Sequence, residues 1–150
     1  MAINFAISKK CVYALRALFE LAARSSDEPV KTREIADAQG IPSRFLEVIF
    51  SELRRGGFLE SRRGSDGGYV LAATPQGVTV GDVLRHVQGR KPDPDMSFGG
   101  PQGHRGDFAF ARFWQQLNAA VANVADGTTL ADLVQYDLDR DSKYVPNYTI

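Results

Sequence analysis

The sequence of 150 residues predicts a mostly α-helical chain with one small β-hairpin and a long C-terminal helix. Three observations predict this fold class. Apolar residues recur at helical spacing in the first half of the chain, a glycine-rich run at 64–68 separates two short β-prone runs, and residues 108–124 form one long amphipathic segment. The apolar fraction of 43% is sufficient for a hydrophobic core.

The first two predicted helices are separated by a polar break. Residues 8–23 form the first helix, and Thr32 is a suitable N-cap for a short second helix over 33–38, which Gly40 ends. The apolar stripe of the first helix consists of Val12, Leu15, Leu18, Phe19 and Ala22.

The third predicted helix begins at Ser43, a suitable N-cap, and runs to about Arg55, before two glycines. Its two faces differ, since each residue turns the helix by about 100°. The face expected to be buried carries Leu46, Ile49, Phe50 and Leu53. The opposite face, expected to point outward with a mixture suited to reading base edges, carries Arg44, Glu47, Val48 and Ser51.

Two short β-prone runs, 58–63 and 69–72, bracket the glycine-rich turn and predict a hairpin with Arg62 and Arg63 at its tip. Glycines 64, 67 and 68 are explained as positions of positive φ in that turn. Three helices followed by such a hairpin describe a winged helix-turn-helix.

Two capping boxes follow. Thr79 and Asp82 open a short helix that reaches Val87, and Thr129 and Asp132 open a last helical turn or two. The long helix over 108–124 lies between them and is expected to form the interface of a homodimer, because its broad apolar face needs a partner surface. The predicted interface residues are Phe110, Phe113, Trp114, Leu117, Val121 and Val124.

The predicted domains are a winged helix-turn-helix domain over 1–89, a proline- and glycine-rich loop over 90–107, and a dimerisation helix with its tail over 108–150. Charge follows a similar division, although the net charge is zero. Residues 1–91 hold 14 basic and 10 acidic side chains, and residues 92–150 hold 4 and 8. A basic front half suits a polyanionic partner.

Double-stranded DNA is therefore the expected partner, with the third helix in the major groove and the hairpin at the minor groove or the phosphates. For Arg54 and Arg55 the helix macrodipole is an equal explanation, and for Tyr69 cross-strand packing is favoured over DNA contact. The candidate DNA-binding residues are Lys9, Lys10, Thr32, Arg33, Ser43, Arg44, Glu47, Val48, Ser51, Arg54, Arg62, Arg63, Gly64, Gly67, Gly68 and Tyr69.

Five segments carry a family resemblance. The sequence resembles the Rrf2 family of winged helix-turn-helix transcription regulators, the IscR, NsrR and CymR type, across nearly the whole chain and in the family's order. The resemblance implies a dimer whose long C-terminal helices cross, with each wing near the DNA half-site of the partner. Repression is the activity that we expect of this regulator. The matching segments are 13–18 (YALRAL), 45–47 (FLE), 63–72 (RGSDGGYVLA), 78–83 (VTVGDV) and 129–133 (TLADL).

One departure from the family concerns metal binding. Many members carry three cysteines between the winged domain and the long helix, and these ligate an iron–sulfur cluster, whereas residues 90–107 contain no cysteine. The resemblance is therefore to the cluster-free branch typified by CymR, and the expected cofactor is none. A relative in that branch is regulated by a biosynthetic enzyme, so a protein or small-molecule effector remains an alternative.

The remaining chemistry is sparse. Cys11 is expected to be a small core residue, with a redox sensor as the alternative, and a metal site at His104 is not expected. Two histidines and no recognisable nucleophile motif speak against an enzyme. A regulator that senses a ligand or oxidant through Cys11 or the 90–107 loop, and an adaptor that controls a metabolic enzyme, stay open. The cytoplasm is the expected location, without membrane contact.

Overall fold

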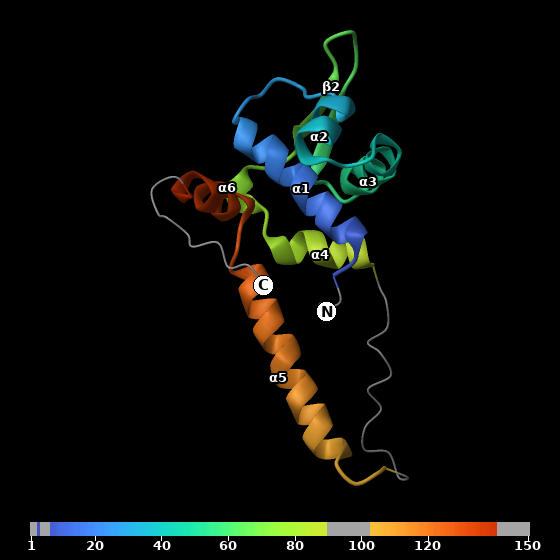
Figure 1. The fold of residues 1–150 in the computed structure, drawn as a ribbon, viewed down its shortest axis with the longest axis vertical. Helices are drawn as coiled ribbons and strands as arrows, with labels where there is room; N and C mark the ends of the chain where they lie inside the picture. Colours follow the sequence, from blue (N-terminus) through green and yellow to red (C-terminus); the bar gives the residue numbers. More distant parts are fainter. Residues whose placement is uncertain (1–2, 4–6, 90–102, 141–150) are drawn as a thin grey trace.

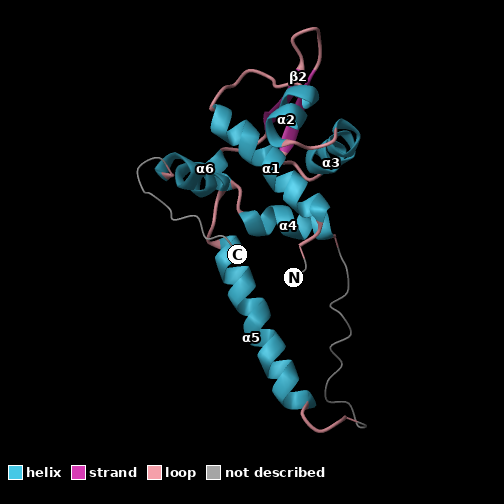
Figure 2. Cartoon of the chain, viewed as in Figure 1, coloured by secondary structure: helices cyan, strands magenta, loops and turns pink. Residues whose placement is uncertain are grey.

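The computed structural model describes residue 3, residues 7–89 and residues 103–140. Within these residues the fold is the predicted one, helical with one antiparallel hairpin (Figures 1 and 2). Its elements are α1 (Lys9–Arg24), α2 (Thr32–Gln39), α3 (Ser43–Arg55), β1 (Leu59–Arg62), β2 (Gly68–Leu71), the 3₁₀ turn η1 (Pro75–Gly77), α4 (Val80–Gln88), α5 (Asp107–Asp126) and α6 (Leu130–Asp139).

Helix α1 runs through the centre of the fold and contacts α2, α3, α4 and α6. Its buried face is rotated from the predicted stripe, because Val12 is exposed and Leu15 and Phe19 are only half-buried. Small side chains on α1 let the neighbouring helices approach closely. The predicted stripe was based on bulky apolar residues, so it placed the buried face at a different angle around the helix. The buried residues of α1 are Cys11, Ala14, Ala17, Leu18, Leu21 and Ala22.

Two helix starts differ from the prediction. Lys31 and Pro42 stand at the N-cap positions of α2 and α3, and neither start has a side-chain cap hydrogen bond. Thr32 and Ser43 are instead the first helical residues. The extended backbone that a cap requires falls one residue earlier, where the chain enters each helix. Gly40 ends α2 in a left-handed conformation with φ 64°, as predicted.

The hairpin pairs Leu59 with Leu71 and Arg62 with Gly68. Beyond the predicted strands, Val30 adds a bridge on the other side of β2, exchanging two backbone hydrogen bonds of 3.0 and 2.9 Å with Tyr69. Only Lys31 separates Val30 from α2, so this bridge fixes the start of α2 beside β1, β2 and their turn, which are together called the wing.

Both predicted capping boxes are present, at Thr79–Asp82 and at Thr129–Asp132. They also contact each other, since the backbone N–H of Val80 donates to Thr128 and that of Leu130 donates to Val78. Helix α6 spans ten residues, longer than the turn or two predicted, and packs on α1 and η1. Helix α5 thus begins far from the core and runs back toward it, and α6 follows within the core (Figure 1).

Helix α5 extends away from the other elements, and its first turn lies at the opposite end of the molecule from the wing (Figure 1). Within α5 only Ala125, near its end, is buried. The described helices include none that is both long enough and apolar enough to cross a bilayer. The domain boundaries remain a prediction, and residues 90–102 of the predicted loop lie outside the described residues.

Candidate nucleic-acid interface

Helix α3 has the two predicted faces. Leu46, Ile49, Phe50 and Leu53 are buried, and together they attach the helix to the core. Fully burying such side chains stabilises the fold by about 1.5–3 kcal/mol each, so the orientation of α3 is firmly set. The outward face of α3, which consists of Arg44, Glu47, Val48 and Ser51, is exposed along its whole length.

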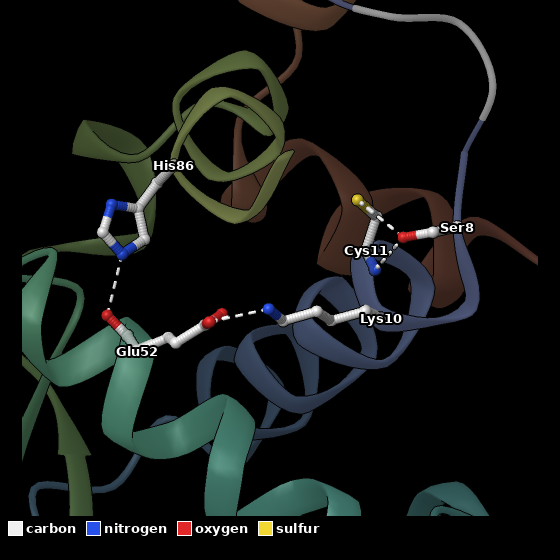
Figure 3. A network of polar contacts seen from close by, with 5 residues as sticks. All are labelled: Ser8, Lys10, Cys11, Glu52 and His86. Carbon is white, nitrogen blue, oxygen red and sulfur yellow. Dashed lines mark hydrogen bonds and ion pairs between the residues drawn. The ribbon is translucent and has the colours of Figure 1, made fainter. Parts of the chain in front are cut away.

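A polar network joins α3 to two neighbouring helices (Figure 3). The Lys10 ammonium lies 2.6 Å from Glu52 Oε1, and His86 Nε2 lies 2.7 Å from the carbonyl oxygen of Glu52. A carbonyl oxygen only accepts, so His86 donates through Nε2. A Cβ at Gly56 would meet the His86 ring at 2.6 Å, so a larger residue there would push this ring away from the end of α3. The network holds α3 between α1 and α4.

Glu52 was not among the predicted site residues, and it changes the view of Lys10. Lys10 was predicted to contact phosphate, and the structure gives its ammonium a carboxylate partner on α3. Lys10 and Glu52 lie 42 positions apart in the sequence, so no local pattern indicated the pair. Lys9, which precedes Lys10 in α1, is exposed.

Two further contacts bring the wing to α3. The guanidinium of Arg54 donates to Ser61 Oγ on β1 at 3.4 Å, and the Tyr69 ring lies 4.6 Å from the Phe50 ring, centroid to centroid. Half-buried Tyr69 thus has the packing role favoured for it, although against a helix. The predicted residues on α1, α3 and the wing therefore belong to adjoining elements.

The wing exposes its two arginines. Arg62 lies 3.5 Å from Glu60 on the same strand, and Arg63 is exposed at the turn. Gly64 has the predicted positive φ, at 113°, but Gly67 does not. A Cβ at Gly67 would collide with the carbonyl oxygen of Arg62, so the tightness of the turn, rather than φ, requires glycine there.

The remaining candidates lie at the helix starts, apart from Gly68 on the wing. Arg33 is exposed and lies 3.9 Å from Asp37, one turn along α2. Thr32 is half-buried, and Ser43 is exposed in the first turn of α3. Gly68 has φ 158°, and a Cβ on it would collide with the Val30 carbonyl, so its place in the wing is explained by packing.

The six predicted dimer residues lie along α5 and are poorly covered by their own chain. Phe113 is 53% exposed and Val124 71% exposed. Phe110 is also exposed, and Trp114, Leu117 and Val121 are half-buried. At the base of α5, an apolar hollow is lined by Val80, Ala120, Val121, Val124, Ala125, Thr128 and Leu133.

The end of α5 is joined to α4 by an ion pair. Arg85 on α4 makes two hydrogen bonds of 2.6 Å to the Asp126 carboxylate at the end of α5. These hydrogen bonds hold the pKa of Asp126 below its ordinary value of 3.8 and raise the pKa of Arg85. A Cβ at Gly81 would collide with the Asp126 carboxylate, so a larger residue there would displace this side chain and disturb the ion pair. The pair spans 41 positions and was not predicted.

The possible metal ligands are scattered. Cys11, the single cysteine of the sequence, is 1% exposed, and its sulfur lies 3.4 Å from Ser8 Oγ (Figure 3). Its expected place in the core is confirmed. His104 is exposed just before α5. The described residues contain no group of three histidine, cysteine or acidic side chains that could hold a metal ion.

A helix-turn-helix that presents a polar helix face beside an arginine-bearing wing defines a winged-helix DNA-binding protein. Residues 7–136 match the Rrf2 family, described as "Iron-dependent Transcriptional regulator". The chain is 37% identical to a putative HTH-type transcriptional regulator of Mycobacterium tuberculosis, over 85% of this chain and 80% of that protein. It is 32% identical to the transcriptional regulator CymR of Bacillus subtilis, over 93% and 96%. The chain belongs to the Rrf2 family of transcription regulators.

Solved structures agree with this assignment. The structure of CymR, "the Global Cysteine Regulator of B. subtilis", has a TM-score of 0.74 and 33% identity, covering 89% of this chain and 98% of that one. The structure of T. potens IscR has a TM-score of 0.75 and 28% identity, covering 97% and 96%. The predicted family and winged-helix fold are therefore confirmed.

Proposed function

We propose that this transcription regulator binds a pseudo-palindromic operator as a homodimer, acts as a repressor, and works without an iron–sulfur cluster. The observation that carries the proposal is the placement of the outward face of α3 next to the wing. A symmetric dimer presents two such heads to two half-sites related by the same two-fold axis.

We assign recognition of the DNA base sequence to α3 and the wing. In the major groove, Arg44 donates to the N7 and O6 acceptors of a guanine, and Glu47 accepts from the N4 amino group of a cytosine. Arg63 enters the narrow minor groove beside α3, where the negative potential is strongest. Lys9 and Arg33, both exposed at helix N-termini, contact phosphates and set the register of the protein on the duplex.

The homodimer is inferred from α5. A helix that projects from its own fold with exposed phenylalanines would be a liability in a monomer, and pairing with a second α5 removes this surface from water. The Arg85–Asp126 pair then transmits the position of the paired helices to α4 and to the reading heads.

The residues present do not fit an iron–sulfur cluster. Such clusters need several thiolates, and the chain has the one thiol of Cys11, which is buried beside Ser8. The family description "Iron-dependent" is therefore not extended to this chain. Protein purified without oxygen is expected to be colourless, and iron or acid-labile sulfide in stoichiometric amount would contradict the proposal.

We also propose that the protein is not an enzyme, because the relatives named above are transcription regulators. Sensing through Cys11 lacks support from its surroundings, because a thiol 1% exposed is closed to oxidants in this conformation. The alternatives that use the 90–107 loop or a partner enzyme remain hypotheses.

The test is selection of bound duplexes from a random library, followed by titration of variants on the enriched sequence. Arg63→Ala should weaken specific binding by about 1–3 kcal/mol. Arg105→Ala should leave binding nearly unchanged, because Arg105 is exposed two residues before α5, whose first turn lies at the opposite end of the molecule from the wing. Equal affinities of the wild type and Arg63→Ala would remove the wing from the interface.

A further inference from the structure

Two large apolar side chains are exposed in the first half of α3. Val48 is 59% exposed and Phe45 is 46% exposed, although both are large and apolar. They border a shallow apolar hollow between α1 and α3, whose other lining residues are Lys9, Lys10, Tyr13 and Ile49. Val48 is flanked on the same face by Glu47 and Ser51, so an apolar contact is available in the middle of a polar surface.

The occupant of this surface is indicated by its charged surroundings. Exposed Lys9 lines this hollow, and the exposed guanidinium of Arg44 lies over the Phe45 ring. Two such cations beside the hollow suit a polyanion. The apolar group that a polyanionic duplex presents in its major groove is the C5-methyl of thymine, which aliphatic side chains contact. We propose that Val48 reads the methyl group of a thymine in each half-site. The inference rests on the proposed function and adds a specificity-determining residue to it.

The position of that thymine follows from the helix. Arg44 and Val48 are four residues apart, so their Cβ atoms are about 5–6 Å apart on one face. The Arg44 guanidinium lies 4.9 Å from the centroid of the Phe45 ring, and this cation–π contact restricts where Arg44 reaches. Base pairs are spaced by about 3.4 Å, so the thymine lies one or two base pairs from the guanine that Arg44 contacts.

The experiment replaces each thymine of the selected duplex by deoxyuridine, which removes only the C5-methyl. At one position per half-site the wild type should bind about fourfold more weakly, the effect of one buried methyl group. Val48→Ala removes the two γ-methyl groups that would contact the thymine methyl, so the difference in affinity between thymine and uracil at that position should become smaller. Leu138→Ala, which shortens an aliphatic side chain 64% exposed on α6, serves as the control and should discriminate as the wild type does.

Three outcomes would overturn the inference. Wild-type affinity that no uracil changes would show that no methyl is read. A uracil effect of unchanged size in Val48→Ala would assign the methyl to another residue. A sensitive thymine more than two base pairs from the position whose specificity Arg44→Ala relaxes would contradict the geometry. Failure of the library to enrich any sequence would instead contradict the proposed function, so the two failures are distinguishable.

Discussion

Helices α3 and α5 both carry large apolar side chains, and they differ in what covers them. Helix α3 buries four such residues against its own chain and leaves a mostly polar face outside. Helix α5 is longer, yet it buries only Ala125 and leaves its phenylalanines exposed. Helix α3 is therefore covered by its own fold, whereas α5 leaves an apolar surface for which we propose a second chain as the partner.

The largest expected effect is a difference in stability between two variants, one at a buried phenylalanine and one at an exposed phenylalanine. Phe50 on α3 is fully buried, so Phe50→Ala should destabilise the fold by about 3–5 kcal/mol. Phe113 on α5 is 53% exposed, and Phe113→Ala should cost the isolated fold much less. Urea unfolding at several protein concentrations measures both, because the contribution of the dimer depends on concentration. Equal losses at low concentration would refute the comparison.

The next prediction concerns self-association. Replacing Trp114 and Leu117 together by glutamate places two charges in the proposed interface and should yield monomers by sedimentation, because unpaired charges are costly to bury. The folded core should survive, as judged by circular dichroism. A dimer of unchanged strength would mean that the interface lies on another element.

The smallest effect is expected at the junction of α4 and α5. Asp126→Asn removes the ion pair with Arg85, and the loss should be slight because the Asp126 side chain is 45% exposed. A lowered pKa means that the folded state binds the proton less readily than the unfolded state, so the pair stabilises the fold above pH 3.8 and loses this effect as the pH falls through the lowered pKa. Thermal unfolding should show the two proteins converging in acid. A difference that grows on acidification would contradict the assignment.

The fold was predictable where the signal is local. The two faces of α3 follow from residue spacing, and each capping box needs only two residues three positions apart. Thr32 and Ser43 were wrongly predicted as caps because the start of a helix depends on how the preceding chain arrives, and Val30 is held by the distant strand β2. The sequence offers no local signal for such long-range contacts.

The candidate site was predictable to a similar degree. The exposure of the outward face of α3 and of Arg63 matched expectation, whereas the partners of these elements did not appear in any pattern. Glu52 and Asp126 each meet a cation more than forty positions away, and only the folded chain brings the pairs together. Which bases and phosphates the predicted residues touch remains a prediction.

The central claim is that two α3 helices, joined through α5, read one symmetric site. Sedimentation equilibrium of the protein with the duplex selected from a random library tests it most directly, with the Trp114 and Leu117 double variant as the control. The expected result is a pseudo-palindromic duplex that carries two chains, with half-sites about one helical turn apart, and weak binding by the monomeric variant. A selected sequence without symmetry that carries a single chain, or full affinity in the monomeric variant, would contradict it.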